Sequence, residues 1–136
     1  MVDPFAGYRD AAGAFTGPFE QTVGYDVELR EGEIVIRLDV DGKHVSQYGV
    51  AHGGVTLTLL DTVGGVAVWY RVRPQRMATI NLACQFLAPA PIGPVLATAT
   101  IDRLGNAVAH TRMALHERDA DGPVLATAIA SYRLFR

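Results

Sequence analysis

The stretch GGVTLTLLDTVGGVAVWY, Gly53–Tyr70, is the most apolar part of this chain, and the arrangement of the remaining elements follows from it. It contains no Lys or Arg, and its apolar residues would cover nearly every side of a helix. A helix of that kind is buried, so we predict a central helix that other elements surround. Arg71, Arg73 and Pro74 follow the stretch, as expected at a helix C-terminus.

One carboxylate, that of Asp61, interrupts the apolar stretch. In a helix its neighbours one turn away would be Leu57, Thr58, Gly64 and Gly65, and none of them is a cation. An unpaired carboxylate in apolar surroundings is costly, and proteins keep such groups mostly where they do chemistry. Asp61 is therefore a candidate functional residue. The alternative is a buried acid satisfied by a distant arginine or by backbone amides.

Alternating apolar and polar residues predict strands on both sides of this helix. Before the helix, a turn at Glu31–Gly32 separates two alternating runs, residues 23–30 and 34–40, which indicates a hairpin. After it we expect four strands, at Met77–Leu87, Val95–Arg103, Ala107–Glu117 and Val124–Phe135. We predict an α+β domain of residues 19–136, an antiparallel sheet wrapped around one long helix, preceded by an arm of residues 1–18.

The first of these four strands has two different faces. The apolar face is expected to carry Ile80, Leu82, Cys84 and Phe86. Thr79 would then lie on the opposite face, with the other polar residues of the strand.

Composition limits the function. The 136 residues suit one domain, and a net charge of −2 gives no basic surface for nucleic acid or an anionic membrane. A single cysteine, Cys84, favours a reducing compartment, so we expect a cytoplasmic protein. The spacing of His44, His110 and His116 indicates no metal site.

The segment His52-Gly53-Gly54 directly precedes the apolar helix. A helix N-terminus carries free N–H groups and partial positive charge, and glycines leave those groups unobstructed. This combination stabilises a bound carboxylate or the oxyanion of an acyl-transfer intermediate. The alternative is a helix entry that needs only a tight turn.

Asp61 lies eight residues beyond Gly53, which is about 12 Å along a helix axis. A carbonyl held by the Gly53 amide is therefore out of reach of Asp61 on the same helix. Two antiparallel helices in a dimer would bring Asp61 of one subunit to Gly53 of the other. Because one sheet layer leaves half of the helix uncovered, we expect a homodimer or homotetramer with composite sites.

The pattern G-x-x-H-G-G with an aspartate nine residues after the histidine resembles the hotdog-fold acyl-CoA thioesterases. It is most similar to the branch of the phenylacetate-pathway thioesterases and their mammalian acyl-CoA relatives, and it also resembles the 4-hydroxybenzoyl-CoA thioesterases. The segment MATINLACQFLAPAPIG, Met77–Gly93, resembles the third-strand signature of that family. The resemblance extends over residues 19–135 and implies a sheet wrapped around one helix, in agreement with the pattern of elements.

The resemblance also implies roles for individual residues. Asp61 corresponds to the family's catalytic carboxylate, acting as general base on water or as nucleophile, and the Gly53 amide to its oxyanion hole. His52, with Gly54 beside it, corresponds to the histidine that orients the loop and contacts the thioester. Thr79 corresponds to a Ser or Thr that places the water in some members.

Two further expectations concern substrate binding. Ser46 stands where members of the family often have Asn, so the way in which the substrate carbonyl or His52 is held here is open. Arg103 is the arginine favoured for the phosphates of coenzyme A, because Gly105 and Asn106 beside it offer open backbone. The alternative for Arg103 is a solvated strand edge.

From these observations we expect an acyl-CoA thioesterase that hydrolyses a CoA thioester to CoA and a carboxylic acid. It would need no cofactor, since coenzyme A is part of the substrate. One alternative is a hotdog dehydratase or hydratase of 3-hydroxyacyl thioesters. Another is a non-catalytic module that binds or senses acyl-CoA.

Overall fold

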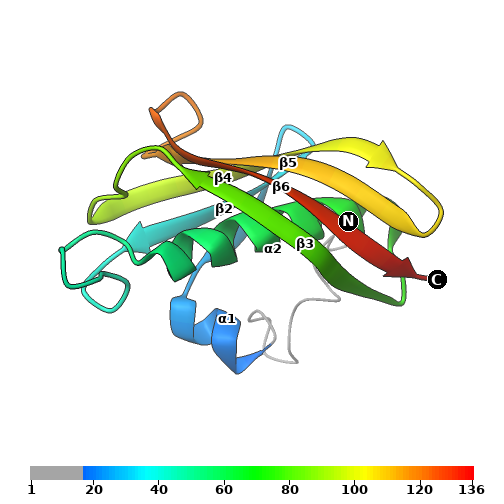
Figure 1. Ribbon diagram of the computed structural model, residues 1–136, viewed down its shortest axis with the longest axis horizontal. Helices are drawn as coiled ribbons and strands as arrows, with labels where there is room; N and C mark the ends of the chain where they lie inside the picture. The colour runs from blue at the N-terminus through cyan, green and yellow to red at the C-terminus, as the bar shows by residue number, and fades with distance from the viewer. Residues whose placement is uncertain (1–16) are drawn as a thin grey trace.

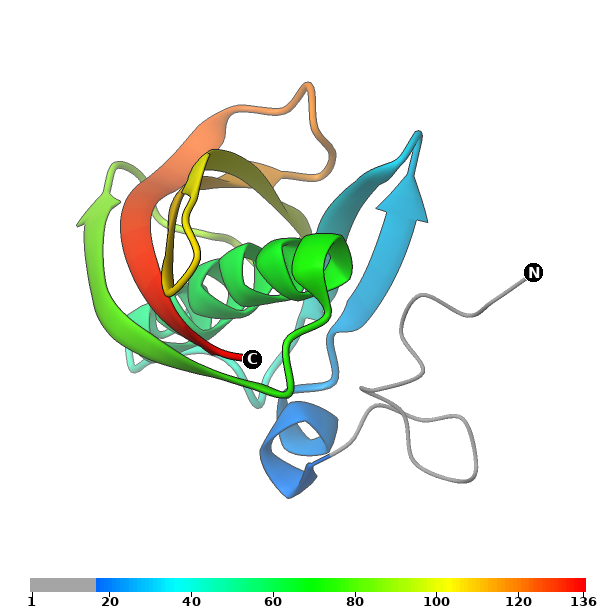
Figure 2. The same ribbon diagram turned by 90° about the vertical axis from the view of Figure 1, so that its right-hand side faces the viewer.

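The computed structural model describes residues 17–136, and its elements confirm the predicted architecture. Their order is α1 (Pro18–Val23), β1 (Asp26–Arg30), β2 (Glu33–Val40), α2 (Gly53–Val72), β3 (Arg76–Phe86), β4 (Gly93–Leu104), β5 (Val108–Glu117) and β6 (Val124–Phe135). The six strands form one antiparallel sheet in the order β1-β2-β4-β5-β6-β3. Figures 1 and 2 show this sheet curling around α2.

One prediction at the N-terminal side was wrong. Residues Pro18–Val23 form the short helix α1, and the first strand begins only at Asp26. Val23 thus belongs to α1, which ends where Gly24 adopts a left-handed conformation with φ of 82°. The predicted arm, apart from Gly17 and Pro18, lies outside the described residues.

The central helix α2 has clear signals at both ends. At its start the His52 side chain accepts a hydrogen bond from the Gly54 N–H, which satisfies one of the free donors of the first turn. At its end Arg73 is left-handed, with φ of 49°, and its N–H donates to the Trp69 carbonyl. The Arg73 guanidinium also lies 4.1 Å from the Trp69 ring centroid.

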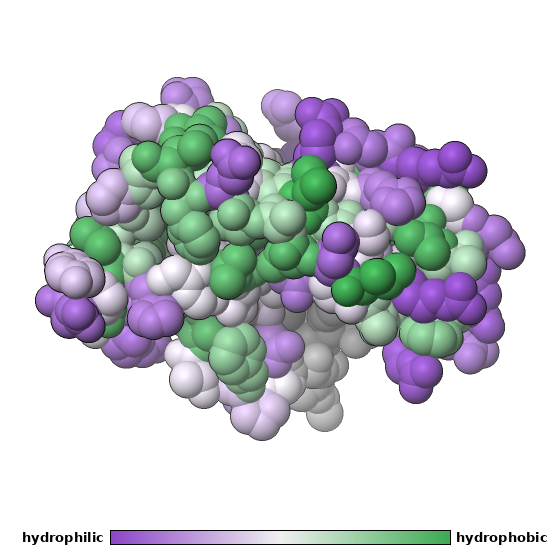
Figure 3. All heavy atoms as spheres, in the orientation of Figure 1, coloured by the Kyte–Doolittle hydropathy of each residue, from purple (hydrophilic) through white to green (hydrophobic). Residues whose placement is uncertain are grey.

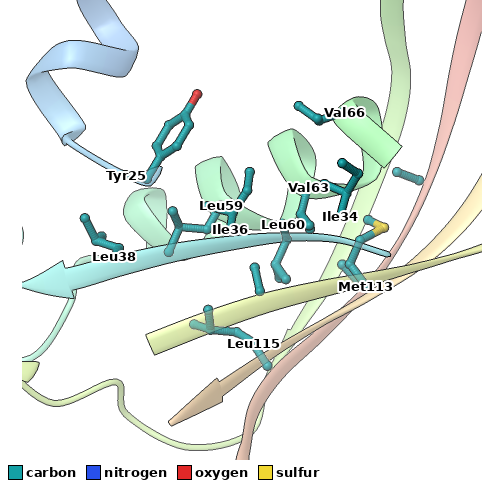
Figure 4. Packing of buried hydrophobic residues seen from close by; sticks show 14 of the residues in the cluster. Tyr25, Ile34, Ile36, Leu38, Leu59, Leu60, Val63, Val66, Met113 and Leu115 are labelled. Carbon is teal, nitrogen blue, oxygen red and sulfur yellow. The ribbon is translucent and has the colours of Figure 1, made fainter. Parts of the chain in front are cut away.

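The core lies between α2 and the concave face of the sheet. Leu59, Leu60 and Val63 of α2 are fully buried and pack against strand residues that include Ile36 and Leu115, as Figure 4 shows. Neither of the two helices in residues 17–136 is both long and apolar enough to span a bilayer.

The two edges of the sheet differ. β1 is five residues long, whereas β3 has eleven residues, and most of them are exposed in the single chain. The surface over β3 carries apolar side chains, which contribute to the apolar areas in Figure 3. A long and apolar open edge is typical of a strand that pairs with another chain.

Candidate active site

Asp61 lies in the third turn of α2 and is half-buried. The Thr79 hydroxyl of β3 donates a hydrogen bond to Asp61 Oδ1 at 2.8 Å. No residue among 17–136 forms an ion pair with Asp61. The carboxylate is thus held in place by a neutral donor, with no cation beside it.

A β-bulge brings Thr79 to this position, which corrects the predicted face assignment of β3. The pairing register with β6 shifts between Thr79 and Asn81, so Ile80 is the extra residue. As a result Thr79, opposite the buried Tyr132, faces α2 together with Leu82. Ile80, predicted to share the apolar face, is 56% exposed instead.

Tyr132 supports the helix directly behind Asp61. Its hydroxyl donates to the Asp61 backbone carbonyl at 2.8 Å, and burial, with Asp61 adding to the effect, raises the pKa of this phenol. A neutral, buried phenol keeps its proton and donates a stable hydrogen bond, so Tyr132 holds the Asp61 backbone carbonyl in place. Its alternating position in β6 was the only signal in the sequence, and Tyr132 was not among the candidates.

The N-terminus of α2 offers a free donor. The Gly54 N–H is bonded to His52 Nδ1 at 2.9 Å, and the Val55 N–H to the His52 carbonyl. The Gly53 N–H, by contrast, has no acceptor among residues 17–136. Because His52 Nδ1 accepts, the neutral ring carries its proton on Nε2 and can donate it at the exposed side.

The loop that leads into α2 is held by backbone and side-chain bonds. The His52 N–H donates to the His44 carbonyl, and Val45 and Ala51 form an isolated bridge. Ser46 Oγ accepts from the Tyr48 N–H at 3.2 Å, so this side chain supports the loop turn. No hydrogen bond within residues 17–136 joins Ser46 to His52.

Within one chain the predicted site residues form two groups that lie apart from each other. Asp61 and Thr79 form one group, while His52, Gly53 and Gly54 form the other at the start of the same helix. The strand β3 passes both groups, because a Cβ atom built on Gly53 would lie 3.5 Å from the Phe86 ring. Phe86 is therefore a neighbour of the free amide that the sequence did not single out for this role.

The predicted phosphate-binding residues lie at the other end of the molecule. Arg103 is the next-to-last residue of β4, and Gly105 and Asn106 lie in the turn into β5. The Arg136 Nε donates to the Asn106 carbonyl at 2.9 Å, which ties this turn to the end of β6. Since Phe135 pairs with Arg76, the turn also lies on the side of the sheet where β3 begins.

The chain is similar in sequence to a known family and to curated proteins. Residues 48–123 match the family model of the thioesterase superfamily. "Putative esterase F42H10.6" of Caenorhabditis elegans is 34% identical over 103 residues, which are 75% of this chain and 60% of that protein. This chain therefore spans less than two thirds of the length of that relative. Human acyl-coenzyme A thioesterase 13 is 26% identical over 111 residues, 79% of either chain.

Solved structures share the fold. The crystal structure of the BH2602 protein from Bacillus halodurans with CoA superposes with a TM-score of 0.80 at 23% identity. The match covers 89% of this chain and 80% of that one. At this identity the similarity establishes the arrangement of sheet and helix.

Proposed function

Because this chain belongs to the thioesterase superfamily, we propose that it is an acyl-CoA thioesterase whose sites are composite, each formed by two subunits. The observation that carries the proposal is that one helix holds both an unbonded N–H donor and a carboxylate without a cation. The Gly53 N–H has no acceptor within residues 17–136, and Asp61 has no cation there. The activity named for human acyl-coenzyme A thioesterase 13 supports the same reaction class.

The chemistry follows from these two groups. The Gly53 N–H of one subunit binds the thioester carbonyl oxygen, and Asp61 of the other takes a proton from water. The water oxygen attacks the carbonyl carbon, the C–S bond breaks, and the departing thiolate of CoA receives the proton. In the alternative route Asp61 attacks first, forming a mixed anhydride that water then hydrolyses. Thr79 holds the carboxylate in either route.

The open edge of β3 supports the composite arrangement. Thr79 contacts Asp61 and Phe86 lies beside Gly53, so this strand connects the two groups. If two copies of β3 pair antiparallel about a two-fold axis through Ala83, with Ile80 bulged out of the pairing in each copy, Thr79 faces the partner subunit's Phe86. Asp61 of one chain then approaches Gly53 of the other, as the chemistry requires.

Arginines that form no ion pair support the proposal that one end of the sheet binds the phosphates of coenzyme A. Arg103, Arg76 and Arg133 form no ion pair within residues 17–136, and the last two stack on the Phe135 ring at 4.4 and 5.5 Å. Arg76 begins β3, about 10 Å along the strand from Thr79. The CoA arm would thus extend from the thioester along β3 towards these arginines, Gly105 and Asn106.

Subunit mixing tests the composite site. Two variants, Asp61→Asn and Gly53→Pro, should each be inactive alone, and they are co-expressed with different tags. Proline is tolerated at the first helical position, and His52 already has the extended backbone (ψ of 141°) that precedes proline. Gly53→Pro therefore removes the proposed oxyanion donor and keeps the helix, while Gly53→Ala is the matched control that retains the N–H.

A composite site predicts that the mixed population regains about a quarter of wild-type activity, because half of the dimers are mixed and each has one intact site. No recovery would mean that each chain builds its own site. If wild-type protein releases no thiol from any acyl-CoA but binds it, the sensing module is favoured. Addition of water to an enoyl-CoA would favour the hydratase instead.

A further inference from the structure

A groove of about 390 Å³ lies beside the N-terminus of α2, between this helix and α1. Its walls are mostly apolar and come from three segments: Phe19 and Val23 of α1, Val45 of the loop, and Val55 of α2. At the helix end the groove is lined by His52 and Gly54, the two chain neighbours of Gly53, whose N–H has no acceptor within residues 17–136. Figure 1 shows α1 beside the first half of α2.

The wall that α1 contributes is fixed by a buried histidine. His44 is 4% exposed, and its Nε2 donates to the Val23 carbonyl at 2.7 Å while its Nδ1 accepts from the Asp41 N–H. The His44 carbonyl in turn accepts from the His52 N–H. One residue thus connects the C-terminus of α1 to the residue that precedes Gly53.

The two sides of the Gly53 amide differ in chemistry. On one side the groove presents apolar walls, with Lys43 at its rim. In the proposed dimer the other side leads along the partner's β3 to its unpaired arginines. A thioester has the same polarity, since its acyl group is apolar and its CoA portion is anionic.

From this geometry we infer that the groove beneath α1 is the acyl-binding pocket, and that it takes an unsubstituted apolar acyl group of medium length. The inference rests on the proposed thioesterase function and specifies its substrate class. The volume is near the lower end of small-molecule sites, which favours a six- to eight-carbon chain or a single ring over a long fatty acyl chain. The subunit that provides Gly53 would therefore bind the acyl group, and the subunit that provides Asp61 would bind the CoA phosphates.

Thioether analogues of acyl-CoA test the groove independently of catalysis, because they bind without being hydrolysed. We would measure the dissociation constants of S-hexyl-CoA and S-ethyl-CoA by calorimetry for the full-length protein and three variants. Phe19→Ala removes one wall, and Val45→Phe fills the groove. Ile129→Ala is the control, since Ile129 is as exposed as Phe19 (56% and 60%) but lies on β6, outside the groove.

Wild-type protein and Ile129→Ala should bind S-hexyl-CoA at least about tenfold more tightly than S-ethyl-CoA. Both groove variants should lose most of this ratio. Because Phe19 is largely exposed, its truncation leaves the fold intact even if Val45→Phe does not fold. An unchanged ratio in Phe19→Ala would overturn the inference.

Hydrolysis of the matching acyl-CoAs, measured in parallel, separates the two proposals. Protein that discriminates the thioethers but releases no thiol would contradict the thioesterase function and leave the groove supported. Protein that hydrolyses hexanoyl-CoA with the same preference in Phe19→Ala as in Ile129→Ala would retain the function and contradict the groove.

Discussion

At the scale of single residues, the arrangement around Asp61 explains how a carboxylate is held within an apolar helix. A neutral hydroxyl, that of Thr79, bonds its side chain, and Tyr132 bonds its backbone carbonyl. An arginine in the place of Thr79 would stabilise the charge more strongly, but it would also lower the basicity of the carboxylate. The observed partners orient Asp61 without neutralising it, which suits a base or a nucleophile.

The Thr79 hydroxyl should matter for turnover more than for binding. We expect Thr79→Ala to lower kcat about tenfold, equivalent to about 1.4 kcal/mol, with little change in KM, because Asp61 loses its orienting donor. Thr79→Ser keeps the hydroxyl and should retain most of the rate. Steady-state kinetics with hexanoyl-CoA measure both variants, and equal losses in the two would show that the methyl group, not the hydrogen bond, is what matters.

At the scale of elements, close contact between α2 and β6 depends on a glycine. A Cβ atom at Gly64 would collide with the Tyr132 hydroxyl and lie 2.9 Å from the Met113 sulfur. The absence of a side chain at Gly64 lets Tyr132 reach the Asp61 carbonyl one turn earlier in the helix. The helix register that positions Asp61 and the packing of β6 are therefore coupled.

Gly64→Ala should destabilise the protein by about 1–3 kcal/mol in spite of the better helix propensity of alanine, since the new methyl group overpacks this contact. Tyr132→Phe removes the colliding oxygen. In the double variant Gly64→Ala/Tyr132→Phe the loss should be smaller than the sum of the two single losses. Chemical denaturation of all three variants gives the coupling, and strict additivity would contradict this contact.

The two edge strands allow a matched test of the proposed dimer. Leu82 of β3 faces inward, so a lysine there could reach solvent past the open edge of a monomer but would be enclosed in a β3-paired dimer. Leu82→Lys should therefore shift the protein to monomers. Leu29→Lys makes the same change on the opposite edge strand β1, where Leu29 is 40% exposed, and should leave the dimer intact.

Sedimentation velocity distinguishes these outcomes, with circular dichroism to verify folding. Dissociation caused by Leu29→Lys alone would locate the interface at β1 and remove the support for sites that combine Asp61 with Gly53 of a partner.

At the scale of the whole molecule, charge is unevenly distributed. The net charge is −2, yet six of the twelve Lys and Arg residues lie on segments that converge at the end of the sheet where β6 finishes and β3 begins. None of the six forms an ion pair within residues 17–136. They are Arg71, Arg73, Arg76, Arg103, Arg133 and Arg136. Arginines without acidic partners are suited to binding phosphate groups.

This charge distribution predicts a salt effect that depends on the nucleotide. The KM for hexanoyl-CoA should rise several-fold at about 1 M salt, where the screening length is about 3 Å. Hexanoyl-pantetheine, which lacks the phosphates and the adenosine, should show a smaller change. Arg76→Gln should reduce the salt dependence, while Arg37→Gln, which removes an arginine paired with Asp39 on β2, should not.

The sequence alone determined the class of fold and most of the candidate residues. A run that is apolar on nearly every side of a helix indicates a buried helix, and segments of alternating apolar and polar residues indicate strands that cover it. For this reason α2 and five of the six strands were predicted close to their observed bounds. The first strand was placed too early, because the apolar Val23 fits both the alternation of a strand and the inner side of α1. The isolated charge of Asp61 and the glycines at the helix entry were visible for the same local reason.

Only the tertiary structure decided how those residues meet. The bulge at Ile80 changes the face of Thr79, and a periodicity of two cannot reveal an inserted residue. Tyr132 and His44 bond residues that are distant in sequence, and Phe19 lines a groove with residues of α2, so no local pattern marks these three. Composition and spacing report on local conformation, whereas the contacts between Asp61, Thr79 and Tyr132 depend on how the sheet closes around the helix.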